Sequence, residues 1–360
     1  MSETTSSCCS STPAPAQSCC CKGSAQPRIL TSGISLHDRF GSIMCRTSNK
    51  FRMHYRINPG LYAVGNPGPD APVLVTANYR LSVNHVRVAL RRHSAWILIL
   101  DTHGINVWCA AGKGTFGTDE LVRQINTTQL KKHVNHTTVI VPQLGAPGVA
   151  AHRVQQETGF RVTYGPVYAS DIPEYLDINN ITTPCMRRVH FSVVDRMKLI
   201  PMEVFPAVKE CSLFLLLMAL LLGMNRTGIL YKQAVLGVYP LFMATATALF
   251  TGSFLVPLLL PWIPFRAFTI KGLLAGIAGC IGLVVAMPVF RTDPYLFGVC
   301  VLGIPVYSSY RAFLFTGSTT YTGPSGVKKE LKAAWPAYRI SMGIVATGLV
   351  LVLLHHWRIV

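Results

Sequence analysis

The sequence predicts an α/β domain followed by an all-α transmembrane domain of five helices. Residues 72–168 alternate continuous apolar runs with amphipathic segments of helical length. From about residue 206 the chain consists of long apolar runs joined by short basic connectors. The acid content falls at the same point, because residues 1–205 hold 12 Asp and Glu and the rest of the chain holds only 3.

The first 50 residues are rich in Ser, Thr and Pro, which predicts disorder. They have neither a basic start nor an apolar core, so we expect no signal peptide and place the soluble part in the cytoplasm. In that reducing compartment the 11 cysteines are expected as thiols or ligands. The N-terminal cysteines lack the C-x₂-C spacing of zinc and iron–sulfur sites, and they predict either a flexible tail or a tether for a soft metal ion. They are Cys8, Cys9, Cys19, Cys20 and Cys21.

The α/β domain is expected over residues 51–205. Its buried strands are predicted at 72–79, 95–100, 137–141 and 161–168. Its helices are predicted at 82–92, 118–133 and 150–159. Thr118 is the expected N-cap of the second helix, and Gly159 is the expected stop of the third. Continuous apolar strands separated by helices indicate a parallel sheet with both faces covered, whose ligands bind at the carboxyl ends of the strands.

The transmembrane domain is expected over residues 206–360. Its apolar runs, each long enough to cross a hydrocarbon core, are 207–224, 233–260, 268–289, 295–314 and 336–355. Prolines predict a kinked or re-entrant end for the second run. The positions of Lys and Arg favour an N-terminus inside and a C-terminus outside, which predicts a multi-pass protein of the inner membrane. No Asp, Glu or Lys lies in the middle of a run, so we expect an anchor or docking platform.

The basic connectors favour lipid headgroups as the acidic partner. The soluble half shows no basic stripe interleaved with aromatic residues, which argues against nucleic-acid binding. The segment GKGTFG (112–117) matches the dinucleotide motif G-x-G-x-x-G, but the next strand ends without the acidic residue that holds a ribose. Val107 occupies the position where a P-loop requires glycine, so a nucleotide site is not supported.

The segment NVWCAAGK (106–113) places a single cysteine, Cys109, in the loop after the second predicted strand. A lone cysteine is most often a small buried hydrophobe. Here small residues follow it, and if 107–113 forms a short helix, Lys113 lies on the same face and favours the thiolate. The residues themselves leave a buried hydrophobe and a metal ligand or nucleophile as open alternatives.

NVWCAAGK is similar at every position to the cap-helix motif N-(V/I)-W-C-A-(A/G)-G-K of the HgcA family, the membrane-anchored corrinoid proteins of mercury methylation. VGNPGPDAPVLVTANY (64–79) and PQLGAPGV (142–149) resemble the corrinoid domain that this family shares with the corrinoid iron–sulfur protein of the acetyl-CoA pathway. The resemblance covers about residues 55–205. The cysteine and a five-span membrane domain distinguish HgcA from that relative. The resemblance implies a Rossmann-like corrinoid-binding domain.

The resemblance also implies a methyltransferase that uses a cobalamin-type corrinoid and forms methylmercury from Hg(II) through a methylcobalamin-type intermediate. Cys109 is the implied catalytic residue and the lower axial ligand of cobalt. Asn106 and Trp108 are expected to fix the helix against the sheet, while the small residues after Cys109 let the backbone approach the ring. The residues expected to bind the corrinoid are Thr76, Asn106, Val107, Trp108, Cys109, Ala110, Ala111, Gly112, Lys113, Gln143, Gly145, Ala146, Gly148, Gly165 and Pro166.

The implied partners are an HgcB-type ferredoxin with two [4Fe–4S] clusters, a methylated folate or pterin as donor (directly or through a methyltransferase), and Hg(II) as acceptor. Two other functions stay open. One is a corrinoid methyltransferase of one-carbon metabolism with a different acceptor. The other is a non-enzymatic, membrane-tethered metal-binding protein that uses the thiols of the tail.

Overall fold

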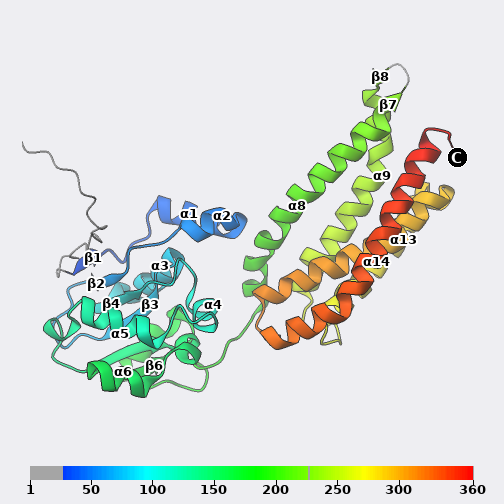
Figure 1. Ribbon diagram of the computed structural model, residues 1–360. Helices are drawn as coiled ribbons and strands as arrows, with labels where there is room; N and C mark the ends of the chain where they lie inside the picture. The colour runs from blue at the N-terminus through cyan, green and yellow to red at the C-terminus, as the bar shows by residue number, and fades with distance from the viewer. Residues whose placement is uncertain (1–26, 226–227, 360) are drawn as a thin grey trace, which may run out of the picture.

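The computed structural model describes residues 27–225 and 228–359. An α/β domain is followed by a region of long helices that projects away from it (Figure 1). Cys8, Cys9, Cys19, Cys20 and Cys21 of the predicted tail lie outside the described residues.

The α/β domain contains a six-stranded sheet in the order β1-β2-β4-β3-β5-β6. The strands are β1 Arg28–Leu30, β2 Gly60–Val64, β3 Val73–Ala77, β4 Ala95–Leu100, β5 Thr138–Pro142 and β6 Arg161–Gly165. The four predicted strands are confirmed as β3 to β6, and these run parallel. The sheet is nevertheless mixed, because β2 pairs antiparallel with β4 and the sequence analysis did not predict it.

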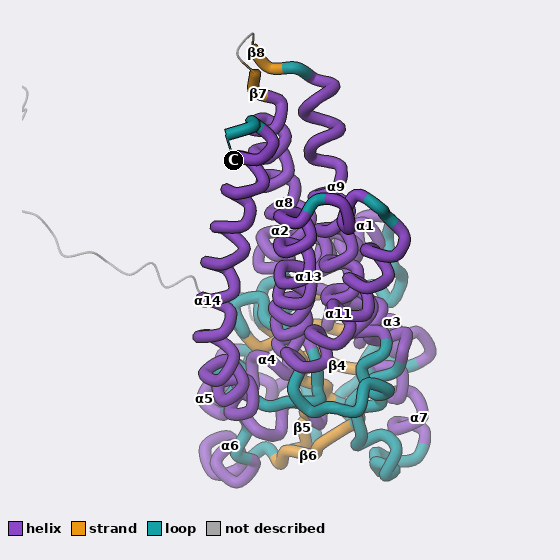
Figure 2. Tube along the Cα trace, turned by 90° about the vertical axis from the view of Figure 1, so that its right-hand side faces the viewer, coloured by secondary structure: helices purple, strands orange, loops and turns teal. Residues whose placement is uncertain are grey.

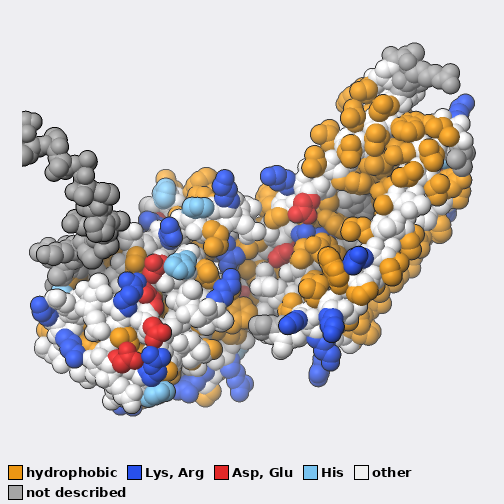
Figure 3. All heavy atoms as spheres, in the orientation of Figure 1, with side chains coloured by type: hydrophobic (Ala, Val, Ile, Leu, Met, Phe, Trp, Pro, Cys, Tyr) orange, Lys and Arg blue, Asp and Glu red, His pale blue; other side chains and the backbone are white. Residues whose placement is uncertain are grey.

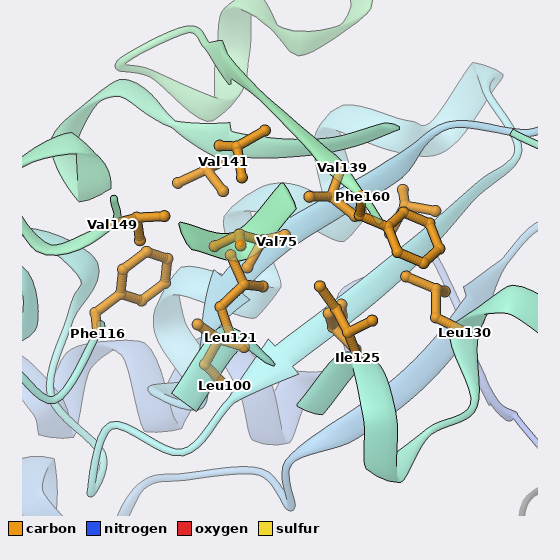
Figure 4. Packing of buried hydrophobic residues seen from close by; sticks show 14 of the residues in the cluster. Val75, Leu100, Phe116, Leu121, Ile125, Leu130, Val139, Val141, Val149 and Phe160 are labelled. Carbon is orange, nitrogen blue, oxygen red and sulfur yellow. The ribbon is translucent and has the colours of Figure 1, made fainter. Parts of the chain in front are cut away.

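Helices cover both faces of the sheet, as predicted. The helices of this domain are α1 Leu36–Thr47, α2 Asn49–His54, α3 Arg80–Ala89, α4 Val107–Gly112, α5 Thr118–Thr127, α6 Ala151–Thr158 and α7 Ile172–Asp177. One core lies between the sheet and α4, α5 and α6, and Figure 4 shows Leu121, Ile125 and Phe160 packed against strand valines there. A second core lies between the other face and α3 and α7.

Part of the segment expected to be disordered is ordered, because β1 and α1 lie within it. Ser35 caps α1 by accepting a hydrogen bond from the Asp38 amide, and the Asp38 carboxylate accepts one from the Ser35 amide, both at 3.1 Å. The same carboxylate accepts a 2.6 Å hydrogen bond from the buried Arg87 guanidinium. The composition predicted disorder, but this capping box and this buried ion pair fix the helix on the domain.

Two predicted helix boundaries shift. α5 ends at Thr127 because Gln129 adopts a left-handed backbone with φ of 50°, after which only a 3₁₀ turn follows. Its N-cap is Gly117 rather than Thr118, whose hydroxyl instead accepts a 2.8 Å hydrogen bond from the Ala150 amide. Gly159 ends α6 with φ of 78°, as predicted.

Five helices after the α/β domain are long and apolar enough to cross a membrane. Their spans are Val193–Gly223 (α8), Tyr231–Leu258, Phe268–Ala286 (α11), Pro294–Ser318 and Ser325–His356. The second span contains α9 (Tyr231–Leu249), a π-helical turn (Phe250–Leu255) and α10 (Val256–Leu258). The remaining elements are β7 Met224–Asn225, β8 Gly228–Ile229, α12 Val289–Thr292, α13 Pro294–Leu314 and α14 Pro324–His356.

The bundle packs through small residues at α11 and α13. A Cβ built on Gly272 would lie 2.6 Å from the Ser308 carbonyl oxygen, and one on Gly276 would lie 2.6 Å from the Pro305 Cα. Glycines four residues apart therefore let the two helix backbones approach closely. Arg311 of α13 is buried beside this contact and donates a 3.1 Å hydrogen bond to the Ser253 hydroxyl in the π-helical turn.

The linker between the sheet domain and α8, residues 178–192, is held at both ends. The Val167 amide donates to the Met186 carbonyl at 2.8 Å, and Met186 is buried in the domain core. At the other end, the Phe191 ring lies 6.5 Å from the Phe315 ring and 6.0 Å from the Tyr321 ring, at the base of the bundle. Figure 2 shows the sheet at one end of the molecule and the long helices extending from the other.

Candidate functional site

The strand order places a topological switch point between β3 and β5. The chain passes from β3 to β4 through α3 on one face, then returns across β3 through α4 and α5 on the other face to reach β5. Sheets of this kind bind ligands at the carboxyl edge beside such a point. α4 follows β4 at this edge, and a 3₁₀ segment, η3 (Gln143–Gly148), follows β5.

Segments α4 and η3 pack closely together, so the structure brings two of the predicted groups of site residues to one place. A Cβ built on Gly148 would lie 2.1 Å from the Phe116 carbonyl oxygen and 3.2 Å from the Ala111 Cα. One on Gly145 would lie 2.5 Å from the ring of Phe116, which is fully buried. The close approach of η3 to the loop after α4 therefore requires glycine at both positions, because Gly148 meets backbone and Gly145 meets the Phe116 ring. Ala146 lies half-buried between them.

The short helix α4 begins at Asn106. The Asn106 backbone is extended (φ −66°, ψ 161°), and its side-chain oxygen accepts a 2.9 Å hydrogen bond from the Cys109 amide. Asn106 is thus an N-cap, which stabilises a helix by about 1 kcal/mol. Asn106 therefore fixes the backbone that carries Cys109. The predicted role was different, because Asn106 was expected to hold the helix against the sheet.

The buried face of α4 consists of Val107, Ala110 and Ala111, which lie at helical spacing and pack into the core. The prediction that Trp108 fixes the helix against the sheet is wrong, because position 108 points away from this face and Trp108 is 39% exposed. Ala110 and Ala111 were expected to leave space for a ring. They instead face the protein interior and let α4 lie close to the sheet and η3.

The outer face of α4 carries Trp108, Cys109 and Gly112, with Lys113 following. Cys109 is half-buried, and the Lys113 amide donates a 3.1 Å hydrogen bond to its carbonyl. The predicted helix is therefore confirmed, and Lys113 follows Cys109 by one helical turn, with an exposed side chain. A Cβ built on Gly112 meets no atom within 4 Å, so the outer side of α4 is open at position 112.

Asn78, a buried residue at the carboxyl end of β3, holds the loop leading to α4 and was not among the predicted site residues. Its side-chain oxygen accepts hydrogen bonds from the Thr102 amide at 3.1 Å, the Thr102 hydroxyl at 2.9 Å and the Gly104 amide at 2.9 Å. Its side-chain nitrogen donates to Asp101 at 2.9 Å. A polar residue ending a fully buried strand is the signal that could have identified it.

Thr76 and Gly165 lie in one row across the sheet, because Pro142 of β5 pairs with Gly165 and β3 is aligned beside β5. Strand alternation points the Thr76 side chain to the α3 and α7 face, opposite to α4. A Cβ on Gly165 would lie 2.8 Å from Ile140, and Pro166 after it is buried. These predicted residues share the carboxyl edge with Cys109 but not its face.

Gln143 lines a cavity of about 330 Å³ at the same edge, together with residues of β6 and of the linker. The other lining residues are Thr163, Tyr164, Asn180, Ile181, Thr182 and Arg187. The Tyr164 hydroxyl donates a 2.8 Å hydrogen bond to the Val149 carbonyl, which ties this cavity to the end of η3. Burial raises the pKa of Tyr164, so this hydroxyl stays protonated and remains a donor at neutral pH.

Free thiols in the described part of the chain are dispersed. Cys45, Cys211, Cys280 and Cys300 are buried and Cys185 is exposed, so Cys109 alone among these combines partial exposure with a position at the carboxyl edge. Residues 27–225 and 228–359 contain no group of three or more His, Cys, Asp or Glu arranged to hold a metal ion. A metal at Cys109 would therefore need most of its ligands from another molecule.

Residues 50–176 match the family described as CO dehydrogenase/acetyl-CoA synthase delta subunit. The chain is 32% identical over 130 residues to the acetyl-CoA decarbonylase/synthase complex subunit gamma of Archaeoglobus fulgidus. The aligned residues cover 36% of this chain and 27% of that protein. The corresponding subunit of Methanopyrus kandleri is 31% identical over 123 residues, or 34% of this chain and 26% of that protein.

The chain therefore spans about a quarter of the length of these relatives. The matched family segment includes the whole of α4 and η3 and ends at residue 176, before α8 begins at Val193. The similarity thus concerns the sheet domain and its carboxyl edge, and the five apolar helices lie outside it.

Proposed function

We propose that this protein is a membrane-anchored, corrinoid-dependent methyltransferase that transfers a methyl group to Hg(II) and forms methylmercury. The observation that carries the proposal is Cys109, a half-buried thiol on the outer face of a capped helix at the switch point of the sheet. The similarity of residues 50–176 to subunits of acetyl-CoA decarbonylase/synthase supports a role in methyl handling. The match of residues 106–113 to the HgcA cap-helix motif supports mercury as the acceptor.

The residues at the carboxyl edge fit a flat macrocycle. The outer side of α4 is open at Gly112, one helical turn from Cys109, and Trp108 offers an exposed indole on this side. When bound, the corrinoid supplies a cobalt centre that carries the methyl group. Cys109 would be the protein residue that holds this cobalt. Sulfur is a strong, soft donor, and as a ligand it would suit a cobalt centre that supplies a methyl group to an electrophile such as Hg(II).

The remaining predicted residues would hold the edge and the tail of the ring. Gln143 and its cavity lie at the carboxyl edge of the sheet. Thr76, Gly165 and Pro166 lie at the same edge, on the face of the sheet opposite to α4. Asn106 fixes the backbone that carries Cys109, and the exposed Lys113 follows Cys109 by one helical turn. Low-potential electrons for each cycle would come from an HgcB-type ferredoxin, and methyl groups from a methylated folate or pterin.

The basic connectors of the membrane domain favour the inner membrane, with the sheet domain in the cytoplasm. Cys109 would then meet donors and Hg(II) from the cytoplasmic side. The five apolar helices would serve as an anchor or docking platform.

The test compares the purified full-length protein with its Cys109→Ala variant. We expect both to carry a corrinoid with visible absorption bands, since ring-edge contacts remain in the variant. The variant should lose the cobalt–thiolate spectral signature and methylmercury formation, while Cys185→Ala, an exposed thiol elsewhere, keeps both. Methylmercury formation by Cys109→Ala at the wild-type rate would show that the thiol is not the ligand.

A second candidate is a corrinoid methyltransferase of one-carbon metabolism with another acceptor, which the names of the relatives favour. Product analysis with and without Hg(II) separates the two, because this candidate gives a methylated product without mercury. A third candidate, a metal-binding protein that uses its tail thiols, would carry no corrinoid bands.

A further inference from the structure

Helix α1 carries an apolar stripe on its outer side. Leu36, Phe40 and Ile43 recur at helical spacing and are 82%, 59% and 61% exposed. The opposite side of α1 packs onto the domain through Asp38, Gly41 and Cys45, which are buried. Single exposed apolar residues are common, but a row of large ones along one helix marks an interaction surface.

Basic residues flank this stripe. Arg39 and Lys50 are exposed, and Arg46 and Arg52 are half-buried. Asp38 is the one acidic residue in Leu36–His54, and its charge is turned inward to the buried Arg87. The outer surface of α1 and α2 is therefore apolar and cationic, the pattern of helices that lie in the plane of a membrane interface. Figure 3 shows hydrophobic, basic and histidine side chains together on this surface of α1 and α2.

Helices α1 and α2 lie beside the first turns of α8, just before the part of α8 that is almost wholly apolar. α1 packs beside α8, and the Arg52 guanidinium lies 3.2 Å from the sulfur of Met202 in α8. Met202 precedes the exposed charged residues Lys209 and Glu210, after which α8 is almost wholly apolar. This separation is about 10–12 Å at 1.5 Å per residue, so α1 and α2 lie about two helical turns from the point where the apolar part of α8 begins.

A second marker places the interface at the same end of the bundle. The Arg196 guanidinium of α8 lies 5.5 Å from the centre of the Trp262 ring, which belongs to the loop after α10 and is 63% exposed. Phe265 of this loop is 45% exposed. Exposed aromatic residues at the end of a span are typical of the membrane–water boundary. Figure 1 shows α1 and α2 beside the lower turns of α8.

We propose that α1 and α2 form an in-plane membrane anchor, with Leu36, Phe40 and Ile43 inserted among the lipids and the flanking basic residues against anionic headgroups. Phe40 lies in the middle of the stripe. The sheet domain is then attached to the bilayer at two places, the linker to α8 and the outer surface of α1. Its carboxyl edge keeps a fixed orientation to the membrane. This inference does not depend on the proposed methyl transfer.

The test uses the full-length protein in bilayer discs of phosphatidylglycerol and phosphatidylcholine. Photoreactive benzoylphenylalanine replaces Phe40, and in a matched control it replaces Gln156, an exposed residue of α6. After irradiation, mass spectrometry should find a lipid adduct at position 40 and none at position 156. Crosslinks from position 40 to protein alone, whether to a second copy or to the N-terminal tail, would overturn the proposal, as would absence of any lipid adduct.

A second variant tests whether the stripe itself makes the contact. Ile43→Asp should remove the lipid adduct at position 40 without unfolding the protein, because the Ile43 side chain is mostly exposed. The circular dichroism and elution volume of the variant check the fold. An unchanged adduct yield in this variant would refute insertion of the stripe. An unchanged yield in discs of phosphatidylcholine alone would refute the role of the basic residues.

Discussion

Replacing Asn78 by Ala should loosen the loop that carries α4 while leaving the sheet intact. The substitution removes the acceptor for two buried amides, those of Thr102 and Gly104. An unsatisfied buried donor costs about 1–3 kcal/mol, and this loop can partly rehydrate, so we expect local stability to fall by about 2–4 kcal/mol. The Thr102 hydroxyl keeps its 2.6 Å bond to the Ile105 carbonyl and limits the loss.

Hydrogen exchange of the full-length protein measures this change directly. A loss of 2–4 kcal/mol corresponds to about 30-fold to several hundredfold faster exchange in peptides covering 101–112. Peptides covering β5 should change little, because β5 does not contact Asn78 through its side chain. Asn135→Ala, which removes an exposed amide, is the matched control and should change exchange by less than about threefold. Equal exchange at 101–112 in the two variants would refute the argument.

Two further predictions concern the ends of the molecule. A reporter fused after Val360 should lie outside the cytoplasm and one inserted near Ser325 inside; finding both on one side would contradict the five-span arrangement. Asp38→Asn should lower the stability of the α/β domain by about 3–5 kcal/mol at neutral pH, because it leaves the buried Arg87 without its charged partner. Burial raises the pKa of Asp38, but hydrogen bonds from Ser35 and Arg87 outweigh this and hold it well below its ordinary value of 3.8. Its stabilisation is therefore present above about pH 4 and lost below, so urea unfolding should show the two proteins converging in acid; a constant gap down to about pH 3 would contradict this.

The sequence predicted the parts of the fold that local patterns encode. β3 to β6 are continuous apolar runs, and their order of alternation with helices predicted parallel pairing. β2 was missed because its apolar run is short, although Leu61 to Val64 are buried, and its antiparallel pairing with β4 is long-range. β1 and α1 were missed because the composition around them resembles that of a disordered tail, while their order depends on the contact of Asp38 with the distant Arg87.

In the candidate site, too, features encoded by local sequence were predictable and features that depend on long-range contacts were not. The helix at Cys109 was predictable from its motif and its place after a buried strand. Which face of that helix is buried depends on packing against η3, so the role of Trp108 was predicted wrongly. The role of Asn78 depends on hydrogen bonds to residues more than 20 positions away, which no local pattern reveals.

The short linker before α8 determines how the thiol can be reached. A carrier domain on a long flexible linker can move between partners and transfer its bound group to each in turn. Here Met186 is fixed in the sheet domain and Phe191 in the base of the bundle, with four residues between them. The domain is therefore held in one position relative to the bundle. In the proposed methyl transfer each partner would travel to Cys109, and the partners would compete for one surface.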